Sequence, residues 1–142
     1  SKPDRDGQVR AMKEALAESG LAPEAIGYIN AHGTATLVGD VVECEAIRAV
    51  FGEAAARIPV SSTKSMHGHL LGGAGALEMA AALMPFAEGI LPPTAHLEQP
   101  DPACALVRHV ACKAERGEIP GAVMSNSFAF GGSNVVLIAE RG

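Results

Sequence analysis

Hydrophobic residues recur at helical spacing in two segments of the first third of the chain. Over residues 9–19 the apolar positions lie three and four apart, and Gly20 follows as a C-terminal stop. A second helix is predicted over residues 40–51, closed by Gly52. Within it, Glu43 shares a face with the apolar residues of the next two turns, so one carboxylate heads an apolar stripe.

Short apolar runs predict strands between these helices and after them. Residues 26–30 and 58–62 each end in a loop of small residues that leads into a helix, and the helix after the second run is rich in alanine and extends to about Ala87. Further strand candidates lie at 106–112, 121–127 and 134–139. Four prolines make the segment 91–102 an extended connector. Strands that alternate with helices predict an α/β fold with a mixed or parallel sheet.

The composition favours one domain, over residues 1–142, with a core of small side chains. A chain of 142 residues is long enough to bury a core, and with 48% hydrophobic but only 4% aromatic residues this core must be largely aliphatic. Charged residues make up only 19%, which suggests that a partner covers part of the surface. A net charge of −5 without a basic run argues against nucleic-acid binding.

No segment of the sequence predicts export or membrane insertion. The polar N-terminus lacks the apolar core of a signal peptide, which favours a cytoplasmic protein. The longest apolar run, 70–86, contains Glu78, Pro85 and three glycines, so it predicts a buried helix instead of a membrane span. The cysteines have no CxxC spacing and are expected to act as small hydrophobic residues, without a disulfide framework or a zinc site. They are Cys44, Cys104 and Cys112.

Two loops of small residues carry the candidate chemistry. His32 follows the first predicted strand and is flanked by Gly33, and His69 closes the segment 64–69 after the second strand. Open α/β sheets bind ligands at the carboxyl ends of strands, and an imidazole handles protons or polarises a carbonyl near neutral pH. Helix N-terminal amides are expected to favour a neutral ring at His69, which can donate to a carbonyl or enolate oxygen. The pattern suggests acyl chemistry, although no nucleophile accompanies it.

Charged and hydroxyl side chains near these histidines have structural as well as functional explanations. Glu43 and Glu78 are the expected partners of Lys64, because Glu78 would be costly to bury alone in its apolar helix. Thr34 and Thr36 either bind an amide-rich ligand arm or cap the next helix.

The segment 126–134 places two phenylalanines in a loop of small residues. It is either a turn with aromatic plugs or a loop whose backbone amides approach a reacting carbonyl while Phe130 gates a pocket. His67 and His69 lie two apart with no third ligand nearby, so no metal site is predicted.

Three motifs together carry a family resemblance. They are Asn-Ala-His-Gly-Thr-Ala-Thr at 30–36, Lys-Ser-Met-His-Gly-His with Gly-Gly-Ala-Gly at 64–75, and Asn-Ser-Phe-Ala-Phe-Gly-Gly-Ser-Asn at 126–134. In this order and spacing they closely resemble the β-ketoacyl-[acyl-carrier-protein] synthases, above all the elongating enzymes of dissociated fatty-acid synthesis. The resemblance covers only the family's C-terminal half. It implies half of a thiolase-like fold, with the nucleophilic cysteine in an absent N-terminal half, so the chain alone is expected to be inactive.

The resemblance also implies a reaction and assigns residues to it. In the family, malonyl-carrier protein loses carbon dioxide, and the enolate attacks a cysteine-bound acyl group in a Claisen condensation. His32 and His69 would hold the malonyl thioester oxygen, while Lys64 would set the electrostatics and pair with Glu78. The Phe130 amide would complete an oxyanion hole with the cysteine amide, and its ring would gate the acyl pocket.

Further residues and partners follow from the same resemblance. The resemblance implies four substrate-binding residues, Thr34, Thr36, Phe128 and Gly131. The two threonines would bind the phosphopantetheine arm. Four residues, Asn30, Glu43, Glu78 and Ser125, resemble positions that in some relatives surround a structural monovalent cation. No other cofactor or metal is implied, because phosphopantetheine arrives on the acyl carrier protein. That carrier, the N-terminal half and a second copy in a homodimer are the expected partners, and neither nucleic acid nor membrane is expected.

Several residues depart from the family's common pattern. Leu37 stands where proline is frequent, His67 where threonine is usual, and Gly73 where alanine is usual. Ala129 replaces the glycine between the two phenylalanines. Its added methyl is expected to restrict the gate loop and to change the acyl-chain preference.

Three alternatives stay open. A partner subunit like the chain-length factors of aromatic polyketide synthases keeps the fold without the cysteine, but the retained histidines and Lys64 argue against it. Modular polyketide synthases share the histidine motifs, yet glutamate usually precedes their Ala-His-Gly where this chain has Asn30. A thiolase would need a cysteine in the late glycine loop, where Phe130 and two glycines stand instead.

Overall fold

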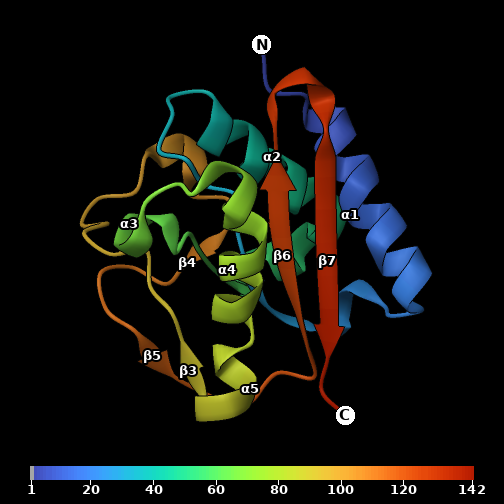
Figure 1. Ribbon diagram of the computed structural model, residues 1–142, viewed down its shortest axis with the longest axis vertical. Helices are drawn as coiled ribbons and strands as arrows, with labels where there is room; N and C mark the ends of the chain where they lie inside the picture. The colour runs from blue at the N-terminus through green and yellow to red at the C-terminus, as the bar shows by residue number, and fades with distance from the viewer. Residues whose placement is uncertain (1) are drawn as a thin grey trace.

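A five-stranded mixed sheet forms the centre of the computed structural model, which describes residues 2–142 except the side chain of Phe130 (Figure 1). Its strands are β1 (Ile26–Asn30), β2 (Pro59–Ser61), β4 (Arg108–His109), β6 (Ala122–Phe128) and β7 (Asn134–Glu140). They lie in the order β4-β2-β1-β6-β7, in which the first four are parallel and β7 runs antiparallel to β6. The predicted α/β class with a mixed sheet is confirmed.

A second, two-stranded sheet is not predicted by the sequence pattern. In it, β3 (Ile90–Leu91) pairs antiparallel with β5 (Glu115–Arg116). Each of these strands has only two residues, too few for an alternating pattern to stand out. The candidate strand 106–112 is likewise shortened to β4, and the proline-rich connector reaches the same edge through an isolated bridge between Thr94 and Ala111.

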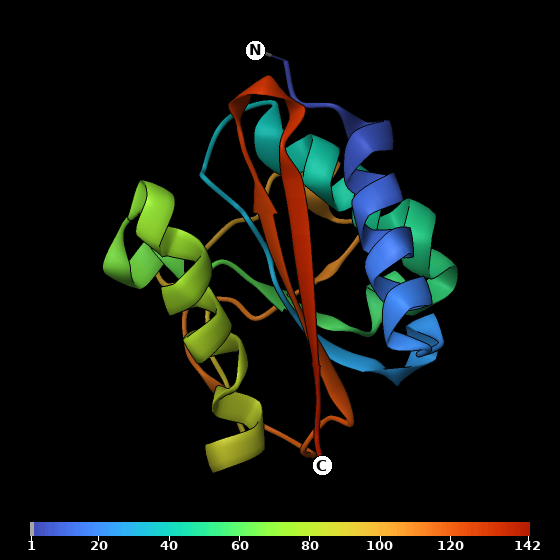
Figure 2. The same ribbon diagram turned by 45° about the vertical axis from the view of Figure 1, so that its right-hand side comes forward.

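Helices cover both faces of the sheet (Figure 2). On one face lie α1 (Arg5–Ser19) and α2 (Gly39–Phe51), and on the other α4 (Ala74–Ala82) and α5 (Met84–Glu88). A one-turn helix, α3 (Lys64–His67), follows β2. Short 3-10 helices are η1 (Pro23–Ala25), η2 (Gly52–Ala56), η3 (Leu71–Gly73), η4 (Pro102–Cys104) and η5 (Phe130–Gly132). Within residues 2–142, no helix has the length and apolar character needed to cross a membrane.

The first helix begins before the predicted segment 9–19 because a polar residue caps it. Asp4 precedes α1 in an extended conformation, and its carboxylate accepts a hydrogen bond from the Asp6 amide at 3.1 Å. The helix ends at the predicted Gly20, whose φ of 71° is left-handed.

The alanine-rich segment after β2 departs from the predicted continuous, buried helix. It is divided into η3, α4 and α5, with a break at Leu83, because Pro85 has no amide hydrogen to continue the helix. Its outer side is exposed, and the Leu71 side chain is 77% exposed. The prediction of burial is wrong because the segment is apolar all round, whereas the sheet covers only one of its sides.

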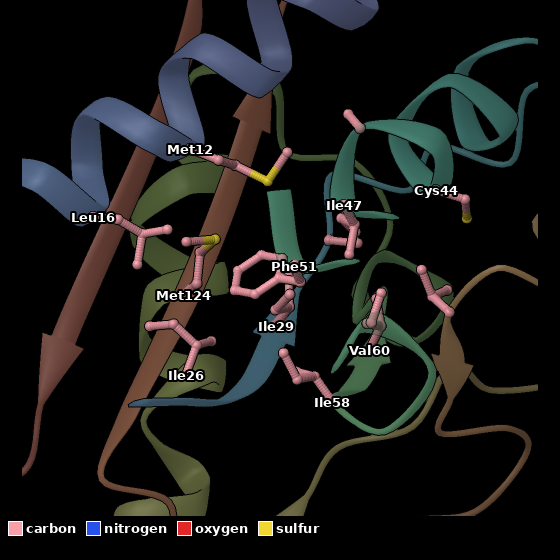
Figure 3. Packing of buried hydrophobic residues seen from close by; sticks show 14 of the residues in the cluster. Met12, Leu16, Ile26, Ile29, Cys44, Ile47, Phe51, Ile58, Val60 and Met124 are labelled. Atoms are coloured by element: carbon pink, nitrogen blue, oxygen red, sulfur yellow. The ribbon is translucent and has the colours of Figure 1, made fainter. Parts of the chain in front are cut away.

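Two apolar clusters pack the helices onto the sheet. The larger one includes Met12 of α1, Ile47 of α2, Ile29 of β1 and Met124 of β6, and it is mostly aliphatic, as predicted (Figure 3). The smaller one contains Tyr28 and lies on the α4 side of the sheet. This packing fixes the strand ends from which the site loops emerge.

Candidate active site

The candidate residues gather at the carboxyl ends of three adjacent parallel strands. His32 follows β1, the segment 64–69 follows β2, and Phe128 ends β6. Parallel strands that neighbour one another end at the same edge of a sheet, which is where open α/β sheets bind ligands. The topology therefore brings residues together that lie far apart in the sequence.

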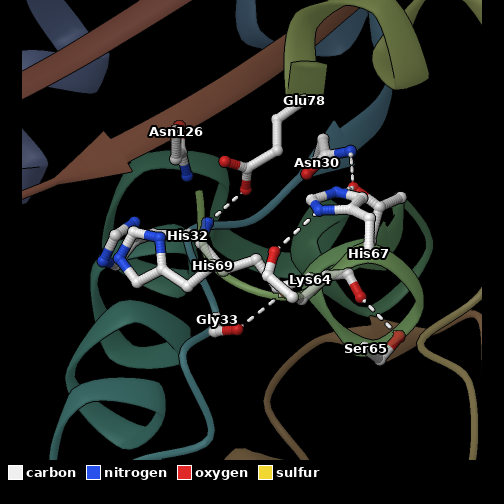
Figure 4. Close-up of polar contacts among 12 residues, drawn as sticks. Asn30, His32, Gly33, Lys64, Ser65, His67, His69, Glu78 and Asn126 are labelled. Atoms are coloured by element: carbon white, nitrogen blue, oxygen red, sulfur yellow. Dashed lines mark hydrogen bonds and ion pairs between the residues drawn. The ribbon is translucent and has the colours of Figure 1, made fainter. Parts of the chain in front are cut away.

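The two loop histidines lie side by side at this edge (Figure 4). The ring centroids of His32 and His69 are 5.6 Å apart with an interplanar angle of 85°, and the Phe128 ring centroid is 6.0 Å from that of His32. His32 is half-buried, whereas His69 is exposed. Two imidazoles at this separation can donate hydrogen bonds to one small group between them.

Glu43 holds the loop that carries His32. Its buried carboxylate accepts hydrogen bonds from the backbone amides of His32 and Gly33, both at 2.9 Å. Asn126 Nδ2, from β6, donates to the same carboxylate at 3.1 Å. Burial raises the pKa of Glu43, and these three donors oppose the rise. The carboxylate thus ties the backbone of the His32 loop to α2 and β6.

His32 is held in its neutral form. Burial, followed by the charges of Lys64 and His69, lowers the pKa of His32 to about 4. At pH 7 the ring therefore carries a single N–H, which can donate a hydrogen bond without a net charge on the imidazole.

One ring nitrogen of His69 accepts a hydrogen bond from the backbone. The Leu71 amide, at the start of η3, donates to His69 Nδ1 at 3.2 Å. In the neutral ring the proton then lies on Nε2, which is left to donate away from the backbone. A helix-start amide faces this histidine, as the sequence predicts, and it selects the tautomer.

Lys64 and Glu78 form a buried ion pair between α3 and α4 (Figure 4). Their side chains are 6% and 0% exposed. A buried charge is costly without a counter-charge. The Lys64 ammonium supplies that counter-charge, so the apolar helix α4 can bury Glu78, its one charged residue. Of the two partners expected for Lys64, the structure shows Glu78, whereas Glu43 binds the His32 loop.

Thr34 and Thr36 line a cavity of about 570 Å³ that Lys64 and His69 also line. Thr36 Oγ1 accepts a hydrogen bond from the Gly39 amide at 3.1 Å, at the first residue of α2. Thr36 therefore lies on the cavity wall and also binds the first amide of α2. The two explanations that the sequence leaves open for this position are compatible.

Two of the cysteines, Cys44 and Cys104, do not have the environment of a nucleophile. Cys44 and Cys104 are buried on the wall of the same cavity, and burial raises the pKa of both thiols. A raised pKa keeps a thiol protonated and unreactive near neutral pH. The expectation of small hydrophobic residues agrees with the burial of these two, whereas Cys112 is exposed.

The remaining assigned positions lie on β1, on β6 and in the turn after β6. Asn30 and Ser125 are register partners on these strands, and both are buried. Gly131 has a φ of 83°, a left-handed conformation that favours glycine. The side chain of Phe130 lies outside the described part of the chain, so its expected role as a gate stays a prediction.

Two buried residues of the site are missed by the sequence analysis. Asn126 binds Glu43, and Thr63 Oγ1 accepts a hydrogen bond from Asn30 Nδ2 at 3.0 Å. The available signal for Asn126 is a polar residue that follows an apolar strand run. A partner on another element cannot be read from such a local signal.

Comparison with known proteins agrees with this arrangement. Residues 1–98 match the family described as β-ketoacyl synthase, C-terminal domain. The chain belongs to the β-ketoacyl synthase family. The 3-oxoacyl-[acyl-carrier-protein] synthase 2 of Synechocystis sp. is 51% identical over 139 residues, which are 98% of this chain and 33% of that protein. The chain thus spans about one third of the length of the curated relatives that it matches.

Solved ketosynthases have the same fold as this β-ketoacyl synthase domain. The ishigamide ketosynthase/chain length factor superposes with a TM-score of 0.92 at 37% identity, over 100% of this chain and 34% of that chain. A type II polyketide synthase acyl-carrier protein in complex with its ketosynthase, bound to the hexaketide, gives a TM-score of 0.91 at 30% identity, over 99% and 34% of the two chains. The thiolase-like fold expected from the resemblance is confirmed.

Proposed function

We propose that the chain is the C-terminal part of a 3-oxoacyl-[acyl-carrier-protein] synthase that elongates fatty acids. The complete synthase would catalyse the decarboxylative Claisen condensation of an acyl thioester with malonyl-acyl carrier protein. The observation that carries this proposal is the pair of His32 and His69, 5.6 Å apart at the carboxyl edge of a parallel sheet. The 51% identity to 3-oxoacyl-[acyl-carrier-protein] synthase 2 of Synechocystis sp. supports it.

The two histidines are suited to stabilise an enolate. When a malonyl thioester loses carbon dioxide, negative charge gathers on the thioester oxygen, where His69 Nε2–H and the N–H of His32 donate to it. Because His32 is neutral at pH 7, it stabilises this charge without giving up its proton. The enolate carbon then attacks the acyl carbonyl on a cysteine of the absent half. A C–C bond forms, the C–S bond breaks, and the cysteine leaves as a thiolate.

The other assigned residues position the substrate around this pair. The charge of Lys64, fixed by Glu78, favours electron density at the enolate oxygen. Thr34 and Thr36, on the cavity wall, bind the phosphopantetheine arm. The other contacts with the acyl substrate are the Phe128 ring, the Gly131 backbone and the Phe130 amide, which completes the oxyanion hole.

Buried oxygens below the site fit a structural monovalent cation. Asn30 Oδ1 and Glu78 Oε2 are buried and have no hydrogen-bond partner among the described residues. Hard cations take oxygen ligands of this kind. We therefore include such a cation, held by Asn30 and Glu78 together with Glu43 and Ser125, in the proposal. It would offset the charge of Glu43, since Glu78 is already paired with Lys64, and no other cofactor or metal is proposed.

Acyl carrier protein is the proposed partner, because it would deliver the thioesters to the cavity. A solved relative is a ketosynthase in complex with its acyl-carrier protein, which supports this choice. The complete synthase is further proposed to be a cytoplasmic homodimer whose N-terminal half supplies the nucleophilic cysteine. With a net charge of −5, the chain is not expected to bind nucleic acid.

The test is an assay of the complete synthase with malonyl-acyl carrier protein and acyl thioesters of several lengths. Carbon dioxide and a 3-oxoacyl product are expected, and His32→Ala or His69→Ala is expected to lower the rate about 100-fold, because each removes a donor to the developing charge. Circular dichroism of the variants controls for folding. The chain alone is expected to give no condensation product. A wild-type synthase that forms no 3-oxoacyl product at any chain length would contradict the proposal.

A polyketide ketosynthase or its chain-length factor is the second candidate, favoured by the TM-score of 0.92 to the ishigamide ketosynthase/chain length factor. The two pathways differ in their products. A polyketide ketosynthase would release poly-β-ketoacyl chains in the same assay. A chain-length factor would not release carbon dioxide from malonyl-acyl carrier protein when assayed without its catalytic partner.

A further inference from the structure

His67 belongs to a chain of hydrogen bonds that links the ends of β1 and α3. His67 Nδ1 lies 2.7 Å from the Gly68 carbonyl oxygen, and His67 Nε2 lies 3.1 Å from Thr63 Oγ1 (Figure 4). Thr63 Oγ1 in turn accepts a hydrogen bond from Asn30 Nδ2 at 3.0 Å. Four residues are thus connected from the end of a central strand to the loop after α3.

With a neutral His67 ring, this chain has a single consistent direction. A carbonyl oxygen only accepts, so His67 Nδ1 carries the proton and donates it to Gly68. Nε2 is then an acceptor, and the hydroxyl of Thr63 donates to it. The Thr63 oxygen remains available to accept from the Asn30 amide, as the structure shows. Each of the three hydrogen bonds therefore has one donor and one acceptor.

The chain ends on the peptide group that precedes His69. Gly68 has a φ of 76° and a ψ of 179°, and glycine offers no side chain to hold this conformation. Thr63 and Asn30 are buried, whereas His69 is exposed. The His67 ring thus connects a rigid part of the core to the exposed histidine loop.

We propose that His67 is a positioning residue that sets the orientation of the His69 ring relative to His32. The inference rests on the proposed function, since both rings must donate to one thioester oxygen. His67 touches no substrate in this mechanism. It acts by holding the Gly68 carbonyl, so that the Nε2–H of the next residue, His69, is directed at the thioester oxygen to which His32 also donates.

The kinetic test uses variants of the complete synthase. His67→Phe keeps a ring but removes both nitrogens, and it is expected to lower kcat about ten-fold, because small misplacements of catalytic groups are costly, with KM for malonyl-acyl carrier protein nearly unchanged. Thr63→Val, which removes the hydroxyl, is expected to have a similar effect. The double variant is expected to be no worse than the single ones, since both break the same chain. His67→Gln, which offers a donor and an acceptor, is expected to recover most of kcat.

A spectroscopic test does not depend on activity. Nitrogen-15 NMR of the complete synthase, with its histidines labelled with nitrogen-15, is expected to show the Nδ1–H tautomer at His67. In Thr63→Val the preference for the Nδ1–H tautomer is expected to be lost. An Nε2–H tautomer in the wild type, an unchanged kcat in His67→Phe, or a double variant with multiplied losses would each overturn the proposal. If the wild-type synthase is inactive, the proposed function fails and the positioning role fails with it. If it is active and His67→Phe is unaffected, only the positioning role fails.

Discussion

The neutral state of His32 couples stability to pH. The pKa of this ring is about 4 in the folded protein, whereas that of an unperturbed imidazole is 6.5. Between these values the unfolded chain binds more protons, so the stability contributed by His32 is complete above pH 6.5 and is lost as the pH falls toward 4. The shift corresponds to at most about 3 kcal/mol, and solvent screening at a half-buried ring reduces this to about 1–2 kcal/mol.

Chemical unfolding measures the contribution of His32 to stability. The wild type and His32→Gln are compared from neutral pH down to about pH 4, the pKa of His32 in the folded protein. Burial raises the pKa values of Asp40 and Glu43, so these groups change stability in the opposite sense, but they do so in both proteins. The difference between the two proteins therefore isolates His32. The wild type is expected to lose about 1–2 kcal/mol relative to the variant as the pH falls. Parallel stability curves would contradict the prediction.

The buried ion pair predicts that one substitution costs more than two. Glu78→Gln leaves the Lys64 ammonium buried without a counter-charge and is expected to lower the free energy of unfolding by about 3–5 kcal/mol. The double variant Lys64→Met/Glu78→Leu removes both charges and is expected to be more stable than Glu78→Gln. Urea unfolding at neutral pH checks the order. A Glu78→Gln protein as stable as the wild type would mean that the pair contributes nothing.

At the scale of helices and strands, local chemistry explains what the sequence predicts well. β1 has its predicted bounds because a short apolar run is enough to define a strand. α1 ends before Gly20, as predicted, because a left-handed glycine stops a helix locally. The burial of the alanine-rich segment depends instead on how much of it the sheet covers. The bond from Asn126 to Glu43 depends on the placement of β6 beside the His32 loop, which no local pattern contains. The site loops and the pairing of Lys64 with Glu78 were predictable, but the contacts of Glu43 with the His32 loop and with Asn126 were not.

A substitution at Gly20, at the end of α1, tests backbone strain without a steric clash. Gly20 has a φ of 71°, and a Cβ added there would meet nothing within 4 Å. Gly20→Ala is therefore expected to cost only the left-handed strain, about 1 kcal/mol. Gly72→Ala is the matched control, because its surroundings are equally open and its φ is not left-handed, and it is expected to change stability by less than about 0.5 kcal/mol. Thermal unfolding of both variants measures the difference, and equal losses would contradict the strain argument.

Across the whole molecule, one segment carries more of the large exposed apolar side chains than any other. Among the side chains that the structure describes, half of the large exposed ones belong to the segment from α3 to α5, and this set is called the α4 surface. It consists of Met66, Leu70, Leu71, Leu77, Leu83 and Met84. Large apolar side chains exposed together on one segment are typical of an interface. Since the curated relatives are about three times as long as this chain, the rest of the proposed synthase would cover this surface.

The chain on its own is therefore expected to associate through the α4 surface. Leu71→Lys/Leu77→Lys places two charges within it and is expected to shift the protein toward the monomer in light scattering and to reduce binding of a hydrophobic dye. The control is Leu106→Lys/Ile119→Lys, which adds the same charge at exposed apolar positions outside this surface and should leave both signals unchanged. An equal effect of the control would show that net charge governs association. A wild-type chain that is monomeric and binds little dye would show that the exposed α4 surface is tolerated in water.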